Sequence, residues 1–519
     1  IFFRPTPCNM RFVAVVLPRG FARHSSSCVN QVYRPGSKVI PCPKPPAPED
    51  VEPCITTRYS ELLKKHAADR KWSPEEIQEV TDKHMLFTWS WSKDIPHISH
   101  GDGIYMVTTD GKYIMDFNSQ AMCSHHGHTC HPRIINRVAK QMAEIPYIYP
   151  GVGIVPIRAQ LTSLLVDMFP GDLNTFTFPS SGAEAVEAAV RTARVVTGRL
   201  KVLSSYRSYH GGTLGAMALT GDQRRWTSEP GDPSVVKMFG PQPYSFAWGQ
   251  SEEEITERCL TVLKEQIMYE GPHKIAAIIA ESVVGTNGVL KPPKGYLQGI
   301  RELCNQHGIM MICDEVMAGF GRTGKLFGFM HEPGLVPDMV TFAKGVNGGY
   351  LPLGGLAIRD FIADHFRKTP GGTAYGSTYN AHPTVLASAH EALLLLMEKD
   401  LVGNAARLES VMVECMEKLA AKHPSIKQAR ALGLFGCIDI QKNRKGDFIC
   451  DVIDPLPAPM ARFKKALLED GLFTFTRGHC FYCNPPLIIT EEELRKGFSI
   501  IDKNLDILDE AMEDYGLGY

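Results

Sequence analysis

The sequence predicts an α/β fold in which helices cover both faces of a mostly parallel central sheet. From about residue 135 to 385, apolar segments of strand length alternate with helical patterns. The expected strands include residues 175–178, 201–204, 275–280 and 309–313, and the expected helices include 183–196 and 295–307. Apolar runs of this kind are typical of parallel strands that are buried on both faces. After residue 386, helical segments (387–398 and 405–423) flank shorter strands such as 434–440, which predicts a smaller α+β domain.

These patterns divide the chain into four expected parts. Residues 1–50 are expected to form a targeting peptide and a proline-rich linker, and residues 51–134 to contribute to the small domain. Residues 135–385 are expected to form the large domain, and 386–519 the C-terminal small domain. Within the second part, residues 61–80 predict one polar helix. Residues 103–117 alternate around Asp110-Gly111, which predicts a β-hairpin.

The composition of the N-terminus predicts import into an organelle. The first 48 residues contain no Asp or Glu but carry seven Lys or Arg residues, together with three consecutive serines at 25–27. This composition resembles a transit peptide, so we expect a mitochondrial protein and otherwise a cytoplasmic one. A tail of accidental composition is the alternative.

The overall composition excludes several classes of function. The net charge of −1 provides no basic field for a nucleic acid, and no apolar run approaches the roughly 20 residues that span a bilayer. We therefore expect neither a nucleic-acid nor a membrane partner. The 14 cysteines form no regular framework, which indicates reduced thiols. The His- and Cys-rich segment 123–131 is interpreted as an active-site loop, and no metal is expected.

Two neighbouring segments predict an acid and a lysine at the same edge of the sheet. The apolar run 309–313 ends in Asp314, and the run 339–343 ends in Lys344. Side chains that follow parallel strands meet in the crevice at the carboxyl ends of those strands. A pyridoxal phosphate enzyme needs this combination, because the lysine binds the cofactor as an imine. The acid keeps the ring nitrogen protonated, so that the ring can withdraw electrons.

Other segments supply candidate contacts to such a cofactor. Gly182 and Ala183 open a helix, whose N-terminus suits a phosphate, although many helices begin with Ser-Ser-Gly simply as a cap. Tyr209, with His210 beside it, follows the next strand and can stack on a flat ring. The remaining candidates are Glu281 at a strand end, Val316 under the ring, Thr378 as a second phosphate contact, and Arg430 for a substrate carboxylate or sulfonate. Arg430 is expected just before a strand; a surface salt bridge is the alternative for it.

Taken together and in this order, the segments resemble the class III (ω-amino acid) pyridoxal phosphate aminotransferases over residues 84–510. The motifs Asp314-Glu-Val-Met-Ala-Gly-Phe-Gly-Arg-Thr-Gly324 and Phe342-Ala-Lys344-Gly are the most specific part of the resemblance. It implies a fold-type-I homodimer, with a seven-stranded type of central sheet and active sites shared between the subunits. It also implies that residues 135–385 bind pyridoxal phosphate.

The resemblance assigns a role to each candidate residue. It implies that Lys344 carries the cofactor, that Asp314 contacts its ring nitrogen, and that Tyr209 and Val316 enclose the ring. The backbone at Gly182 and Ala183 would bind the phosphate with Thr378 of the second subunit, and Arg430 would bind the α-carboxylate of the acceptor. The chain is most similar to the taurine or β-alanine:pyruvate subgroup. It departs from common patterns at Met122, Ser282, Met317 and Ala431.

The resulting hypothesis is a ping-pong transaminase. The amino group moves from an ω-amino acid or a taurine-like amine to pyruvate, glyoxylate or 2-oxoglutarate. An alanine–glyoxylate type of aminotransferase is one alternative. A pyridoxal phosphate lyase, decarboxylase or aminomutase on the same fold is another, because those enzymes share the cofactor residues. A non-catalytic binding protein is disfavoured, since Lys344 and Asp314 are both present.

Overall fold

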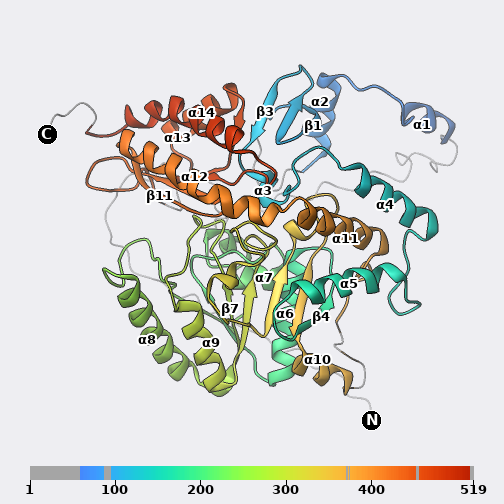
Figure 1. Ribbon diagram of the computed structural model, residues 1–519, viewed down its shortest axis with the longest axis vertical. Helices are drawn as coiled ribbons and strands as arrows, with labels where there is room; N and C mark the ends of the chain where they lie inside the picture. The colour runs from blue at the N-terminus through green and yellow to red at the C-terminus, as the bar shows by residue number, and fades with distance from the viewer. Residues whose placement is uncertain (1–58, 87–94, 370–371, 373–374, 452–454, 515–519) are drawn as a thin grey trace, which may run out of the picture. The chain divides into compact units, whose positions relative to one another are not determined.

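The computed structural model (Figure 1) describes residues 59–86, 95–369, 372, 375–451 and 455–514. The expected targeting peptide and linker, residues 1–50, lie outside this range. The described residues belong to one compact unit, Cys54–Tyr519. None of the helices in the described part of the chain combines the length and apolar character needed to cross a bilayer.

A seven-stranded sheet forms the centre of this unit. Its strands follow the order β4 (Leu173–Thr177), β10 (Gly355–Arg359), β9 (Met339–Phe342), β8 (Met310–Asp314), β7 (Ile275–Glu281), β5 (Lys201–Ser205) and β6 (Val235–Met238). Only β10 runs antiparallel to its neighbours in this sheet. The mostly parallel sheet predicted from the sequence is therefore confirmed.

Alternate residues of the central strands face two separate helical layers. Met310 and Ile312 pack with helices α6 (Gly182–Thr197), α7 (Leu214–Leu219) and α10 (Asp360–Arg367). Met311 and Cys313 belong to the other apolar cluster, with α5 (Pro156–Met168), α8 (Glu252–Glu270) and α9 (Tyr296–His307). Successive side chains of a strand point to opposite faces, so strands that are apolar throughout must be covered on both sides.

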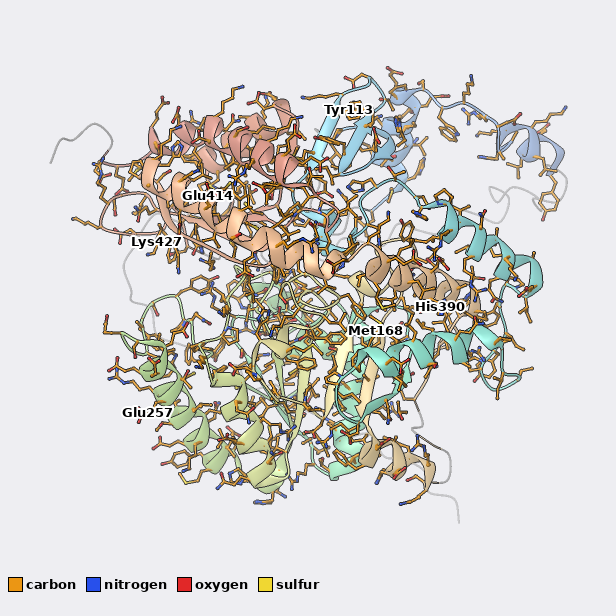
Figure 2. The ribbon with its side chains drawn as sticks, in the orientation of Figure 1. Tyr113, Met168, Glu257, His390, Glu414 and Lys427 are labelled. Carbon is orange, nitrogen blue, oxygen red and sulfur yellow. The ribbon has the colours of Figure 1, made fainter. Side chains whose placement is uncertain are left out.

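Helix α8 shows how the covering helices are specified. Cys259, Leu263 and Ile267 are buried and recur every four residues, so they form one apolar stripe that faces the sheet layer. Glu257 lies on the exposed side of the same helix (Figure 2). Ser251 caps the helix by accepting a hydrogen bond from the N–H of Glu254. Three glutamates follow in the first turn, where their negative charges interact favourably with the positive end of the helix dipole.

Two four-stranded sheets lie outside the central sheet. The first contains β1 (Ile98–Asp102), β2 (Tyr105–Thr108), β3 (Tyr113–Asp116) and β13 (Leu472–Phe473). The second contains β11 (Ile426–Leu432), β12 (Phe435–Ile440), β15 (Cys480–Cys483) and β14 (Thr476–Arg477). Because β13 pairs with β3, segments more than 350 residues apart share one sheet. The exact domain limits stay predictions.

The remaining helices are α1 (Tyr59–Lys65), α2 (Pro74–His84), α3 (Ser119–Met122), α4 (Pro132–Glu144), α11 (Pro383–Glu398), α12 (Leu401–Lys422), α13 (Ala458–Glu469) and α14 (Glu491–Asp509). Short 3₁₀ turns cover Gln223–Ser228, Pro272–Lys274, Gly328–His331 and Lys344–Val346. In Figure 1, the C-terminal helices α12, α13 and α14 lie together, and α12 contacts β11 and α14.

Of the two local predictions for residues 61–117, the β-hairpin is confirmed and the single helix is wrong. The hairpin around Asp110-Gly111 is confirmed by the antiparallel pair β2 and β3, with Gly111 at a φ of 84°. The single helix expected over residues 61–80 is wrong, since α1 ends at Lys65 and α2 begins at Pro74. The reason is a capping box at Ser73, whose hydroxyl accepts from the N–H of Glu76 while the Glu76 side chain accepts from the N–H of Ser73.

Candidate active site

Lys344 and the predicted site acids lie at the carboxyl edge of the central sheet. Asp314 ends β8, Glu281 ends β7, and the two residues are direct neighbours in the strand register. Lys344 follows β9 at the start of a 3₁₀ turn and has a φ of 45°. A left-handed conformation costs a non-glycine residue on the order of 1–3 kcal/mol, and such residues cluster at functional sites.

The surroundings of Lys344 favour its neutral amine. Burial lowers the pKa of Lys344, and the charge of Arg224 acts in the same direction, while Cys123, Asp314 and Glu281 oppose the change. A lysine with a lowered pKa is a better nucleophile and proton acceptor near neutral pH. Gly345 leaves room for His125, because a Cβ there would stand 2.3 Å from Cε1 of that ring.

Asp314 is buried and held in one orientation. Its Oδ1 accepts a hydrogen bond from the N–H of Val316 at 3.0 Å, and its Oδ2 lies 2.7 Å from Nδ1 of His210. A carboxylate offers about four acceptor positions, so these two contacts leave capacity for a third donor such as a protonated ring nitrogen. Nε2 of His210 has no hydrogen-bond partner among the described residues.

Glu281 acts on the backbone that positions Tyr209. One carboxylate oxygen accepts from the N–H of Tyr209 at 2.9 Å, and the other accepts from the N–H of Gly285 at 2.8 Å. Burial raises the pKa of Glu281 to about 7, although both hydrogen bonds favour the ionised form. Glu281 thus links the end of β7 to the loop after β5, where the ring of Tyr209 is partly exposed.

The start of α6 forms a tight cradle beside the strand ends. Ser181 caps this helix by accepting from the N–H of Glu184, and the N–H groups of the first turn have no partner within the helix. A Cβ on Gly182 would stand 2.9 Å from Cγ2 of Val316 and 3.4 Å from Cβ of Ala343. Glycine at this position therefore lets the helix N-terminus approach the segments that carry Asp314 and Lys344.

Thr378 and Arg430 stand apart from this group. Thr378 is exposed, and its carbonyl accepts a hydrogen bond from the hydroxyl of Tyr147 at 2.6 Å. Arg430 lies within β11, so the expectation that it precedes a strand is wrong. Its guanidinium binds both oxygens of Asp439, at 2.6 and 3.0 Å, and its Nε donates to the carbonyl of Gly288 at 2.6 Å. These contacts already occupy Arg430, and its role in binding an acceptor stays a prediction.

Cys480 and Cys483, which bound the segment Cys480-Phe-Tyr-Cys483, belong to different apolar clusters. Cys480 belongs to the apolar cluster that contains Cys437, whereas Cys483 belongs to the main core. The ligand atoms of Cys437, Asp439 and Cys480 lie within 4.8 Å of one another. Arg430 supplies a positive charge to Asp439 there, with Nη1 at 2.6 Å from Oδ2.

Two arginines next to Tyr209, Arg224 and Arg477, were not among the site residues predicted from the sequence. Arg224 binds Asp222 through Nε and Nη2, and its Cζ lies 3.7 Å from the centre of the Tyr209 ring. Arg477 reaches the same Asp222 from β14, with Nη2 at 3.0 Å from Oδ2. Arg477 and Asp222 are 255 positions apart, so no local pattern could have joined them.

The residues at the strand ends fit pyridoxal phosphate. Lys344 supplies an amine, Asp314 supplies a buried carboxylate for a protonated ring nitrogen, and the N-terminus of α6 suits a phosphate. The missing side chain of Gly182 lets this N-terminus pack closely beside Val316 and Ala343, next to Asp314 and Lys344. An aldehyde, a ring nitrogen and a phosphate on one planar ring are the functional groups that this set can bind.

Comparisons with known proteins agree with this chemistry. Residues 91–505 match the family model of the class-III aminotransferases. A crystal structure of taurine:2-oxoglutarate aminotransferase from Bifidobacterium kashiwanohense, in complex with pyridoxal phosphate and glutamate, is similar with a TM-score of 0.81. It is 36% identical in sequence, and the similarity covers 85% of this chain and all of that one.

Two curated relatives extend the comparison. Taurine–pyruvate aminotransferase of Bilophila wadsworthia is 32% identical over 356 residues, which cover 66% of this chain and 77% of the relative. The mitochondrial γ-aminobutyrate transaminase 1 of Oryza sativa subsp. japonica is 28% identical over 448 residues, which cover 82% of this chain and 85% of the relative.

Proposed function

The chain belongs to the class-III aminotransferases, which are pyridoxal phosphate enzymes, and from that premise we propose that it transfers the amino group of an ω-amino acid or a taurine-like amine to a 2-oxo acid. Pyruvate, glyoxylate and 2-oxoglutarate are the candidate acceptors. The arrangement of Lys344 and Asp314 at adjacent strand ends, with His210 on Asp314, carries this proposal. The relatives named for taurine and γ-aminobutyrate support the choice of donor class.

Each residue of the site has a defined task in the transfer. Bound pyridoxal phosphate supplies an aldehyde carbon that takes up the amino group and a conjugated ring that withdraws electrons. The Lys344 amine would hold the cofactor, and its lowered pKa would let the same amine accept and return a proton during the transfer. Asp314 stabilises the proton on the ring nitrogen, and His210 orients the Asp314 carboxylate.

The other candidate residues orient the ring and its phosphate. Tyr209 and Val316 would enclose the ring, and Glu281 fixes the backbone of Tyr209. The N–H groups at Gly182 and Ala183 would bind the phosphate, where the partial positive charge of the helix N-terminus adds to the attraction.

A panel of amino donors tests the proposed function. Taurine, β-alanine, 4-aminobutyrate and alanine are each added to the holoenzyme without an acceptor, and the absorbance of the lysine-bound cofactor is followed. We expect at least one of the ω-amino donors to convert the cofactor to its amine form and a 2-oxo acid to restore it. Product formation from every reactive donor without an acceptor, and with the absorbance unchanged, would instead indicate lyase or decarboxylase chemistry.

We also propose that two chains form a homodimer with shared active sites. Thr378 is exposed near apolar side chains that are themselves unusually exposed: Tyr149 (53%), Val152 (77%), Ile154 (92%) and Tyr379 (61%). Tyr147 connects the two segments, because its hydroxyl donates to Thr378 and its ring packs 5.6 Å from that of Tyr379. Exposed apolar groups of this extent support a subunit interface.

Replacing Thr378 by alanine tests this shared site. If Thr378 of one chain binds the phosphate held by the other, the variant should stay dimeric but bind the cofactor about tenfold more weakly, because a charge-assisted hydrogen bond is lost. Sedimentation gives the mass, and a cofactor titration gives the affinity. Thr369→Ala is the matched control, since the Thr369 hydroxyl follows helix α10 and donates to the carbonyl of His365 in it. A monomer with full cofactor affinity would contradict the proposal.

For localisation, we propose import into mitochondria. The absence of acidic residues among the first 48 positions, together with seven basic ones, supports this proposal. A fluorescent protein fused to residues 1–50 should co-localise with mitochondria. Diffuse cytoplasmic fluorescence would argue against it.

A further inference from the structure

Asp222, Arg224 and Arg477 form a positively charged cluster next to Tyr209. One buried carboxylate faces two guanidinium groups, so the three side chains carry a net charge of +1. The Asp222 side chain is only 3% exposed, whereas the Arg224 and Arg477 side chains are 23% and 21% exposed. The cluster therefore presents its arginines, and not its aspartate, to solvent.

The cluster is rigidly held. Arg224 Nη2 donates to the hydroxyl of Thr286 at 2.8 Å, and Arg477 Nη1 donates to the carbonyl of Thr286 at 2.8 Å. The hydroxyl of Tyr482 donates to that same carbonyl at 2.6 Å. Burial alone would raise the pKa of Asp222, but the two arginines outweigh it and lower the pKa to about 2, so the carboxylate stays ionised. Two arginines that are fixed in place pay little conformational entropy when an anion binds.

Two observations place the cluster next to the reacting groups. The Arg224 guanidinium lies over the Tyr209 ring, and Tyr209 follows β5 at the same sheet edge as Asp314. The charge of Arg224 also acts on Lys344, where it contributes to the lowered pKa. Arg430, by comparison, is matched one-to-one with Asp439 and binds the carbonyl of Gly288, so its charge is already neutralised.

We propose that Arg224 and Arg477 bind the acid group of the substrate, the carboxylate or sulfonate that lies at the far end from the reacting carbon. This inference rests on the proposed transaminase function and names the residues that select acidic substrates over plain amines. Guanidinium groups suit both anions, because their fixed positive charge and N–H donors match the oxygens of a carboxylate or a sulfonate. Asp222 holds the two guanidinium groups together and keeps the net charge at one.

The test compares substrates and ligands that differ only in the acid group. β-Alanine is compared with propylamine as the donor, and ethanesulfonate, which is taurine without its amine, serves as a non-reacting ligand. For Arg224→Gln and Arg477→Gln we expect the KM for β-alanine to rise about tenfold to a hundredfold. The kcat/KM for propylamine should stay within about twofold. Calorimetry should show a similar loss of ethanesulfonate affinity.

Matched variants separate charge recognition from structure. Arg194→Gln removes a guanidinium of similar exposure that pairs with Asp232 at 2.7 Å, and it should change neither the KM nor the ethanesulfonate affinity. Arg224→Lys keeps the positive charge, so it should recover part of the KM for β-alanine and part of the ethanesulfonate affinity. If Arg224→Gln does not fold, Arg224→Lys provides the test of this residue.

Three outcomes decide the inference. An unchanged preference for β-alanine over propylamine in both glutamine variants would overturn it, and so would a loss confined to Arg430→Gln. Equal losses for β-alanine and propylamine would indicate a purely structural role and would also overturn it. If the unmodified enzyme failed to transfer an amino group from any donor, the proposed function itself would fail. Ethanesulfonate binding that depends on Arg224 and Arg477 would still support the acid-binding cluster.

Discussion

Replacement of Lys344 by alanine is expected to lower turnover by at least about 10⁴-fold. Two contributions disappear together, because the same amine holds the cofactor and moves the proton in the proposed reaction. The absorbance of the lysine-bound cofactor should be absent from the variant. Steady-state kinetics with a 2-oxo acid acceptor and the absorbance spectrum of the reconstituted protein measure the two effects.

Lys237 provides the control for a partly buried lysine in the same sheet. Its Nζ donates to the Ser204 hydroxyl at 2.9 Å and to the carbonyls of Ala218 and Leu219 at 2.7 and 2.6 Å, so its donors are used within β5, β6 and α7. Lys237→Ala should reduce the free energy of unfolding by about 1–3 kcal/mol and keep the cofactor absorbance. A Lys344→Ala enzyme with full turnover would contradict the assignment of Lys344.

Replacement of Asp314 by asparagine is expected to lower kcat by about 10²- to 10³-fold. Asparagine can still accept from the N–H of Val316 and contact His210, so the geometry at the end of β8 is preserved. The negative charge that stabilises a proton on the ring nitrogen is lost, and the ring withdraws electrons less well. The measurement is the rate of a single half-reaction with a saturating amino donor.

Asp338→Asn is the matched control for Asp314→Asn. Asp338 is equally buried next to β9, but its Oδ2 accepts from Arg301 and from the N–H of Met311, both at 2.7 Å. Removing this charge leaves Arg301 buried without its partner. The expected result is a loss of about 3–5 kcal/mol in stability with little change in kcat. Equal kcat values for Asp314→Asn and the unmodified enzyme would contradict the role of Asp314.

The central part of this fold was predictable because its determinants are local. Apolar runs of strand length, helices between them and an acid or lysine at a strand end each occupy a few consecutive residues. The register then brings Glu281, Asp314 and Thr341 into line, as parallel strands require. The break between α1 and α2 was also encoded locally, in the Ser73 capping box, but the polar helical pattern on both sides concealed it.

The substrate end of the site was not predictable because its determinants are distant. Arg224 and Arg477 meet on Asp222 only after β14 is placed beside the loop that carries Thr286. Arg430 had the residue type and the motif of an acid-binding group. Its partner Asp439 lies on the adjacent strand β12, and the β11–β12 pairing brings the two together. The sequence alone could not show that Arg430 is already paired with Asp439, as the structure shows.

The most direct test of the central claim is the identity of the lysine that carries the cofactor. The holoenzyme is treated with borohydride, which fixes the cofactor to its amine, and is then digested and mapped by mass spectrometry. The account predicts a phosphopyridoxyl group on Lys344, at the end of β9. A cofactor attached to any other lysine, or to none, would contradict it.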